Sequence, residues 1–303
     1  MKILVPCLCG PTGVGKTDLA LLFAERYNFA IISCDSRQIY KYLDIGTAKP
    51  PKEIREKYEF YMIDIITPDK YYSAHQYAQE TAKIIEDLKE KNKRFLMVGG
   101  SGLYFKALFS PFFPAPEVDR NLREELQKKP LSLLYEELKK VDKLSAERIH
   151  PHDKQRIIRA LEIYYLTKKP FSDFITQKKE SKFQPLYIGI NLERKVLYQR
   201  INERFEKMIE MGLIEEVERL LKMGYDENSP GLKTIGYLEV IAYLKGKLTK
   251  EAMLSLAKKN TRNYAKRQLT WFKKENIPYW VINDSLEESF SKIENILKNH
   301  QLL

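Results

Sequence analysis

One octapeptide near the N-terminus limits the possible folds more than any other part of the sequence. Residues 10–17 read GPTGVGKT and fit the pattern G-x-x-x-x-G-K-[ST]. Residues 2–9 before it are mostly apolar, as in a buried strand, and the apolar residues of 17–27 after it have helical spacing. A strand, a glycine-rich turn and a helix in this order form a phosphate-binding loop, because backbone N–H groups and the helix N-terminus surround an anion.

The side chains of this loop indicate what it binds. Lys16 supplies a positive charge to phosphate oxygens, and the hydroxyl group of Thr17 is suited to Mg²⁺. Pro6 is unusual in a central strand, because proline cannot donate a hydrogen bond to a neighbouring strand. We therefore predict that phosphate or diphosphate, with Mg²⁺ as cofactor, is bound by Gly10, Pro11, Thr12, Gly13, Val14, Gly15, Lys16 and Thr17.

Further strands and helices alternate after this loop, which predicts an α/β fold. We expect a P-loop NTPase-like parallel sheet with helices on both of its faces. The expected strands are residues 2–9, 29–33, 60–66, 94–98, 186–192 and 277–282. The expected helices include residues 73–92 and a long helix over 193–223 with a break near Gly212.

The middle of the chain departs from this alternation. After the proline-rich segment 111–116, residues 119–183 show helical periodicity and no strong strand. We therefore predict one α/β core, formed by residues 1–118 and 184–303, that is interrupted by a helical insertion at 119–183.

Charge points to a polyanionic partner. The chain has 52 Lys and Arg against 41 Asp and Glu, a net charge of +11. The insertion contains 16 basic and 11 acidic residues, and residues 258–274 contain seven basic residues and no acid. The excess positive charge therefore lies in these two segments. A helix with one basic face and an opposite face packed on the core suits a phosphate backbone. The alternative is an ordinary solvent-exposed helix surface.

Several classes of protein are excluded. No apolar stretch approaches the 18 residues of a membrane span, so we expect no membrane association. The three cysteines, Cys7, Cys9 and Cys34, form neither a disulfide framework nor a zinc pattern. We expect a cytoplasmic protein, and nothing in the sequence indicates an obligate interface, so we expect a monomer.

The second nucleotide-binding signal of a triphosphate hydrolase is missing. Such an enzyme usually carries an Asp for Mg²⁺ at the end of an apolar strand. The best strand for it, 94–98, ends in Gly99-Gly100, and Asp64 is a substitute of doubtful register. The loop is therefore predicted to hold a diphosphate without cleaving a γ-phosphate.

Asp35 is the candidate general base. It directly follows the strand at 29–33, and ligands of doubly wound sheets bind at the carboxyl ends of the strands. A carboxylate in that crevice can accept a proton from an attacking nucleophile. A helix N-cap or an outer ligand of Mg²⁺ is the alternative role.

Seven segments together resemble the tRNA dimethylallyltransferase (tRNA isopentenyltransferase) family. They are GPTGVGKT (10–17), DSRQIYKYLDIGTAKP (35–50), VGGSGLYFKAL (98–108), RIHPHDKQRIIRALEIY (148–164), RINERF (200–205), GLKTIGYLEV (231–240) and TRNYAKRQLTWFKK (261–274). They occur in the family's order and span nearly the whole chain.

The resemblance implies transfer of a dimethylallyl group from dimethylallyl diphosphate to N6 of adenosine 37 next to the tRNA anticodon, with release of pyrophosphate. Asp35 would be the general base, and Lys16, Thr17, Mg²⁺ and Arg204 would stabilise the leaving group. The family contacts tRNA at positions that correspond here to Asp35, Ser36, Arg37, Gln38, Ser101, Arg123, Gln155, Arg156, Ile157, Ile158, Arg159, Lys233, Thr234, Ile235, Gly236, Tyr237 and Leu238.

Two other functions use the same sequence features. An ATP-dependent kinase of nucleosides or small metabolites would share the P-loop core but would leave the basic segment at 258–274 without a role. A nucleotide-gated RNA-binding module would use Asp35 only as a cap.

Overall fold

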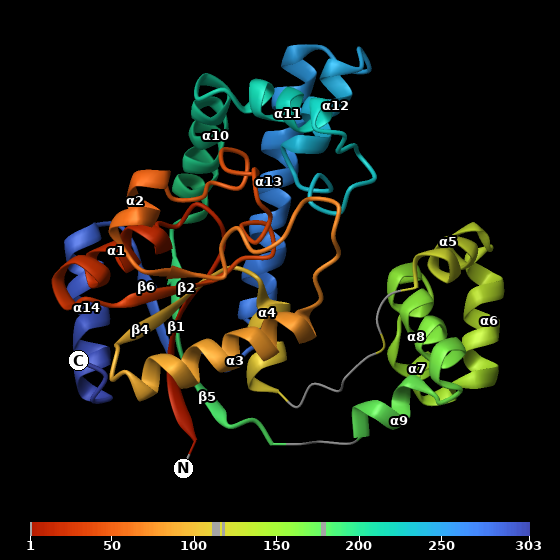
Figure 1. Ribbon diagram of the computed structural model, residues 1–303, viewed down its shortest axis with the longest axis horizontal. Coiled ribbons are helices and arrows are strands. Elements are labelled where there is room, and N and C mark those ends of the chain that lie inside the picture. Colours follow the sequence, from red (N-terminus) through yellow and green to blue (C-terminus); the bar gives the residue numbers. More distant parts are fainter. Residues whose placement is uncertain (1, 111–115, 117–118, 177–179) are drawn as a thin grey trace. The chain divides into compact units, whose positions relative to one another are not determined.

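The computed structural model describes residues 2–110, 116, 119–176 and 180–303. The chain separates into two compact units, Met1–Phe109 with Lys182–Leu303 and Ser110–Ser181 (Figure 1). The proline-rich segment at 111–116 lies almost entirely outside the described residues. The larger unit is the α/β core, and the smaller one is described separately below.

A six-stranded sheet forms the centre of the larger unit. Its order is β3-β2-β4-β1-β5-β6, and all the neighbouring strands pair in parallel. The strands are β1 (Ile3–Cys9), β2 (Ala30–Cys34), β3 (Phe60–Tyr61), β4 (Phe95–Gly99), β5 (Phe183–Asn191) and β6 (Tyr279–Ile282). The predicted α/β class with a parallel sheet is confirmed.

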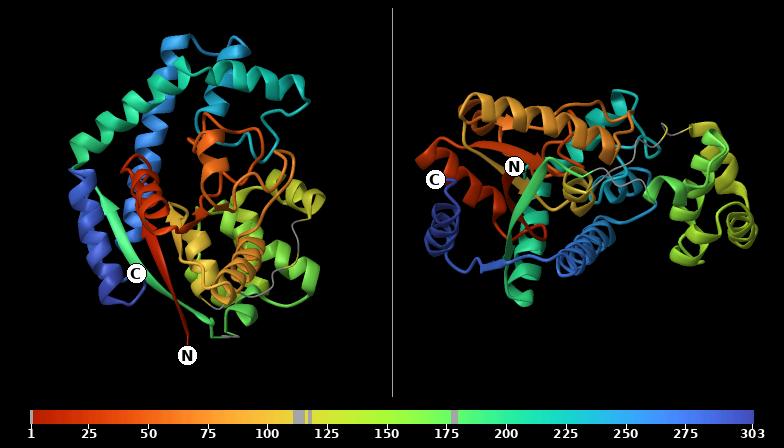
Figure 2. Two further views of the ribbon diagram at one scale, coloured as in Figure 1. Left: turned by 60° about the vertical axis from the view of Figure 1, so that its left-hand side comes forward. Right: turned by 90° about the horizontal axis from the view of Figure 1, so that it is seen from below.

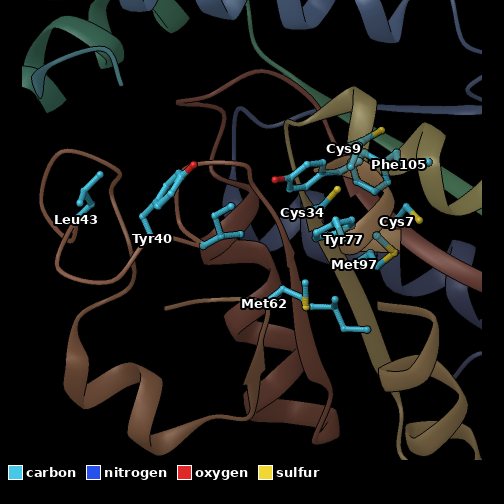
Figure 3. Close-up of a cluster of buried hydrophobic side chains, with 14 of the residues drawn as sticks. Cys7, Cys9, Cys34, Tyr40, Leu43, Met62, Tyr77, Met97 and Phe105 are labelled. Carbon is cyan, nitrogen blue, oxygen red and sulfur yellow. The ribbon is translucent and has the colours of Figure 1, made fainter. Parts of the chain in front are cut away.

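Helices cover both faces of the sheet because successive strand residues point in opposite directions. In β1, Cys7 and Cys9 pack with α3 (Ala74–Glu90) and α4 (Gly102–Phe109), as Figure 3 shows for the neighbouring Tyr77 and Phe105. Leu8 between them packs with α1 (Lys16–Tyr27) and α14 (Leu286–Asn299). Figure 2 shows α3 and α14 on opposite sides of the sheet.

The predicted strand at 60–66 is much shorter than expected. β3 ends at Tyr61 because Met62 and Asp64 adopt left-handed backbone conformations, with φ of 62° and 55°. The carboxylate of Asp64 forms ion pairs with Lys49 and Arg55. Asp64 is therefore engaged in a salt-bridge cluster next to this turn.

The second half of the core is helical and frames the end of the sheet. Its helices, besides α14, are α10 (Arg194–Glu210), α11 (Leu213–Lys222), α12 (Tyr237–Leu244) and α13 (Lys250–Phe272), whereas α2 (Lys52–Lys57) belongs to the first half. The break near Gly212 is confirmed, since this residue has a φ of 97° between α10 and α11. α13 packs along α10, and Arg262 donates a hydrogen bond of 2.6 Å to Asn202.

The smaller unit consists of short helices with their own hydrophobic core. They are α5 (Arg120–Lys128), α6 (Leu131–Val141), α7 (Lys143–Arg148), α8 (Lys154–Thr167) and α9 (Phe171–Thr176). Aspartates cap α5, α7 and α8, because Asp119, Asp142 and Asp153 each accept a backbone N–H of the first turn. The core contains Leu134, Leu138 and Leu161, all fully buried.

Three further expectations concern the chain as a whole. Across the described ranges, no helix has the length and apolarity that crossing a bilayer requires. Cys7, Cys9 and Cys34 are buried free thiols, so there is no disulfide among them. Within the same ranges, no group of three or more His, Cys, Asp and Glu is placed to hold a metal ion.

Candidate active site

The phosphate loop lies between the end of β1 and the first turn of α1, as the sequence predicts. Gly13 and Gly15 have φ of 89° and 86°, conformations that favour glycine and turn the loop toward the helix N-terminus. Val14 is buried below the loop, where its carbonyl oxygen accepts a hydrogen bond of 2.7 Å from Asn283. The loop is thus anchored from beneath by a residue that follows β6.

Lys16 folds back over the first turn of the loop. Its Nζ donates hydrogen bonds to the carbonyl oxygens of Gly10 and Pro11, at 3.0 and 2.7 Å. Desolvation lowers the pKa of Lys16 to about 8, Asp35 opposes this shift, and the positive charge of Arg204 adds to it. The ammonium group therefore loses its charge within an accessible pH range when no anion is bound.

This lowered pKa predicts how anion binding depends on pH. Below about pH 8 Lys16 is charged and attracts phosphate oxygens, whereas at higher pH the neutral amine does not. We expect the affinity of the protein for inorganic diphosphate to fall as pH rises from 7 to 9.5, as measured by titration calorimetry. In Lys16→Met we expect weaker binding and no transition near pH 8, because the titrating amine is gone. The ratio of the wild-type affinity to the variant affinity cancels the titration of diphosphate itself. A wild-type to variant ratio that does not change with pH would contradict this assignment.

Arg204 and Thr12 hold the tip of the loop to α10. Arg204 Nη2 donates a hydrogen bond of 2.8 Å to Thr12 Oγ1. Desolvation lowers the pKa of Arg204, while Asp35 and Asp18 partly oppose the shift. A guanidinium group in this position can reach two oxygens of a diphosphate.

Asp35 follows β2 and begins a tight turn. Its Oδ1 accepts the backbone N–H groups of Arg37 and Gln38, at 2.8 and 3.4 Å. The cap-like contacts considered for Asp35 are therefore present, but they use one oxygen. The same residue lines both of the cavities described next, which the cap role alone does not explain.

Two cavities open beside this loop. The first, of about 540 Å³, extends over the phosphate loop and is lined by Lys16, Thr17 and Asp18. The second, of about 270 Å³, is lined by Arg37, Lys233, Tyr264 and Arg267. Both cavities are lined by Thr12, Asp35, Thr47 and Arg204. The candidate base and the candidate arginine thus lie where the cavity over the phosphate loop and the basic, aromatic cavity meet.

The predicted tRNA-contacting residues of the larger unit fall into two groups. Lys233, Thr234 and Ile235 line the second cavity, and the side chains of Lys233 and Leu238 are exposed. Gly236 and Tyr237 are buried, and the hydroxyl group of Tyr237 donates a hydrogen bond of 2.6 Å to Glu216. The structure therefore gives Tyr237 a packing role, while its neighbours at 233–235 face the cavity.

The residues that follow Asp35 are held by loops from elsewhere in the unit. The N–H of Ser36 donates to Ser101 Oγ at 2.9 Å. Arg37 donates to the carbonyl oxygen of Pro230 at 3.2 Å, and Gln38 donates to that of Ala48 at 3.2 Å. This turn is therefore fixed in place beside the candidate base.

In the smaller unit, the predicted residues of α8 separate by helix face. Gln155 and Arg156 are exposed, whereas Ile157 and Ile158 are 0% and 4% exposed and belong to the hydrophobic core. Arg159 donates to Glu162 at 2.7 Å. The structure therefore assigns the two isoleucines to packing and leaves Gln155 and Arg156 available at the surface.

Glu162 is the residue of this unit that sequence reasoning missed. Its side chain is fully buried, and it accepts hydrogen bonds from Arg123 at 2.8 Å and from Arg159. Both arginines remain about a quarter exposed. They share one buried carboxylate, so part of their charge is neutralised within the unit.

Three further residues of the larger unit were not singled out from the sequence. Thr47 lines both cavities, Gln268 contacts the phosphate loop, and Glu216 binds the backbone of residues 44–46. Gln268 lies within the basic segment at 258–274, where the sequence signal comes from the charged residues and an uncharged side chain carries none. Glu216 carried no local signal, because its partners are about 170 residues away in the sequence.

Comparisons with known proteins agree with this arrangement. Residues 38–275 match the family model described as IPP transferase. The chain is 42% identical to a tRNA dimethylallyltransferase of Dictyoglomus turgidum, over 99% of this chain and 93% of that protein. It is 45% identical to a tRNA dimethylallyltransferase of Thermotoga neapolitana, over 96% of this chain and 97% of that protein.

Solved structures give the same result. A crystal structure of a tRNA isopentenylpyrophosphate transferase from Staphylococcus epidermidis matches with a TM-score of 0.72 and 36% identity, covering 99% of this chain and all of that one. A eukaryotic dimethylallyltransferase, captured in crystallographic snapshots acting on tRNA, matches with a TM-score of 0.82 and 28% identity, covering 98% of this chain and 80% of that one. On this evidence, the chain belongs to the tRNA dimethylallyltransferase family of IPP transferases.

Proposed function

We propose that this enzyme transfers the dimethylallyl group of dimethylallyl diphosphate to N6 of adenosine 37 in tRNA and releases pyrophosphate. The observation that carries this proposal is the meeting of the two cavities at Thr12, Asp35, Thr47 and Arg204. A diphosphate held over the phosphate loop would place its alkyl group toward this junction. An adenine turned out of its RNA loop would enter from the other side.

Asp35 would act as the general base on the exocyclic amine. The lone pair of this amine is delocalised into the adenine ring, so it is a weak nucleophile. As the new C–N bond forms and the C–O bond to the diphosphate breaks, one N–H proton would pass to the carboxylate of Asp35. Its hydrogen bonds with Arg37 and Gln38 keep the carboxylate in one orientation for this transfer.

The phosphate loop, Lys16 and Arg204 would stabilise the leaving group. Negative charge grows on the diphosphate as the C–O bond breaks, and preorganised donors lower the energy of that transition state. Lys16 would exchange its present partners, the carbonyl oxygens of Gly10 and Pro11, for phosphate oxygens. Arg204 already lies against Thr12 at the tip of the loop.

Mg²⁺ fits the oxygen donors at this place. The residues Thr17, Asp18 and Asp35 line the first cavity together, and Mg²⁺ commonly binds through one or two protein oxygens, phosphate oxygens and water. We propose that the hydroxyl group of Thr17 is its protein ligand. When bound, the ion supplies positive charge that neutralises the diphosphate.

Contacts with tRNA would come from the wall of the second cavity. Arg37, Lys233 and Arg267 supply positive charge there, and Tyr264 supplies an aromatic ring beside them. Desolvation raises the pKa of Tyr264 to about 12, so its hydroxyl group stays protonated. Cations suit the phosphates of the RNA, and an aromatic face suits an unstacked base.

We further propose that the enzyme acts as a monomer in the cytoplasm, where tRNA is modified. Sedimentation at the mass of one chain, alone and with one bound tRNA, would support this. The kinase alternative is not favoured, because Asp64 is engaged by Lys49 and Arg55 and β4 ends at Gly99.

Labelled donor provides the direct test. We expect label from dimethylallyl diphosphate carrying ¹⁴C in its alkyl group to appear on unmodified tRNA in the presence of Mg²⁺. A matched tRNA transcript with guanosine at position 37 should remain unlabelled, which locates the acceptor. Transfer of ³²P from γ-labelled ATP to a nucleoside, without alkyl transfer to tRNA, would overturn the proposal in favour of a kinase.

A further inference from the structure

A glutamine on α13 holds the phosphate loop. Gln268 is 6% exposed, and its Oε1 accepts the backbone N–H of Thr12 at 2.9 Å. Its Nε2 donates to the carbonyl oxygen of Gly100, also at 2.9 Å. These partners fix the orientation of the amide, because an N–H needs an acceptor and a carbonyl needs a donor. One side chain therefore joins the loop after β1 to the turn after β4.

The fit around this amide is close. A Cβ atom added to Gly100 would lie 2.1 Å from Nε2 of Gln268, and the backbone conformation of Gly100 is not in the left-handed region. A glycine at this position therefore serves the approach of the glutamine and not an unusual φ. A side chain at residue 100 would therefore displace the amide of Gln268.

The same helix lines the cavity proposed for the acceptor. Thr261, Tyr264 and Arg267 of α13 line the second cavity, and Gln268 follows Arg267 directly. Thr12 is held on its other side by Arg204 of α10. The backbone of the loop tip is thus attached to the acceptor-side helix, and its side chain is attached to α10.

We infer that Gln268 is a positioning residue that fixes the Thr12 turn for the diphosphate and links it to the helix that lines the acceptor cavity. This inference rests on the proposed function for the identity of the two substrates. Gln268 uses the N–H of Thr12 itself, so the remaining N–H groups of the loop are left to the anion. Without Gln268, this N–H would be unpaired in a partly buried place, and the turn would lose its fixed geometry.

The test separates donor from acceptor. In Gln268→Met, which keeps the length of the side chain without its hydrogen bonds, we expect KM for dimethylallyl diphosphate to rise about tenfold, the factor for one such bond. We expect KM for tRNA to change less than twofold. Thr270→Ala, at an exposed position of the same helix, is the matched control and should change neither constant.

A second variant tests the same contact from the other side. Gly100→Ala would place a Cβ atom 2.1 Å from Nε2 of Gln268 and 3.1 Å from the carbonyl oxygen of Gly10, so it should raise KM for the donor at least as much as Gln268→Met. Equal changes in the two KM values, or a lowered melting temperature with both KM values unchanged, would overturn the inference. Binding of inorganic diphosphate to the same variants, which requires no turnover, should weaken in parallel. This binding assay therefore tests the role of Gln268 even if the proposed reaction is wrong.

Discussion

Asp35→Asn is expected to lower the rate of alkyl transfer by about 10²–10⁴-fold, the range that general-base catalysis supplies. Asparagine keeps an oxygen that can accept the N–H groups of Arg37 and Gln38, so the turn after β2 should persist. It cannot take a proton from the adenine amine. Single-turnover assays with saturating donor and tRNA would measure the loss, and filter binding should show tRNA affinity within about twofold of wild type.

The matched control for this variant is Glu203→Gln. Glu203 lines the rim of the first cavity, so the substitution removes an equal charge near the same diphosphate without touching the junction. We expect less than about a threefold change in rate, as for an exposed charge. If Asp35→Asn and Glu203→Gln had the same rate of alkyl transfer, the contribution of Asp35 would be electrostatic. Asp35 would then not be the general base.

The phosphate loop was predictable because its signal is local. Strand, glycine turn, Lys16 and Thr17 are adjacent in the sequence, and the structure places them together without help from distant residues. Asp35 was predictable for a related reason, since the end of a neighbouring parallel strand must open on the same edge of the sheet. The short β3 was not predictable from its apolar residues. Its end depends on the left-handed conformation of Met62 and on ion pairs made by Asp64.

Residues that hold the site from behind gave no comparable signal. Gln268 and Thr12 are separated by 256 positions, and Asn283 and Val14 by 269. Hydrophobic periodicity places a helix against a sheet, but it does not say which polar side chain meets which backbone group. In α8, by contrast, the separation of surface from core was available, because Ile157 and Ile158 follow the apolar face of the helix. The resemblance grouped them with the exposed Gln155 and Arg156 as one contact segment.

Glu216 is expected to contribute most to the stability of the site among these supporting residues. Its side chain is 3% exposed, and its Oε2 accepts the N–H groups of Asp44 and Ile45 at 3.1 and 2.9 Å. Its Oε1 accepts the N–H of Gly46 at 3.3 Å and the hydroxyl group of Tyr237 at 2.6 Å. A buried carboxylate with four donors fixes the loop that leads into Thr47, which lines both cavities.

Glu216→Ala removes all four acceptor contacts and leaves the donors buried. We expect it to lower the free energy of unfolding by about 3 kcal/mol, since unpaired buried groups cost about 1–3 kcal/mol each and water entering the space recovers part of this. This corresponds to a fall in melting temperature of about 6–12 °C for a unit of this size. Calorimetry would measure it, with Glu215→Ala as the matched control, because Glu215 is the exposed neighbour on α11.

Tyr237→Phe separates the hydroxyl donor from the three backbone donors. Removing one neutral partner should cost about 1 kcal/mol, and in the Glu216→Ala background it should cost almost nothing. Below its melting temperature, Glu216→Ala should also raise KM for both substrates, because the loop before Thr47 borders both cavities. A stable Glu216→Ala protein with unchanged KM values would show that this loop is held by its other contacts. Glu216 would then be a dispensable partner of the N–H groups at 44–46.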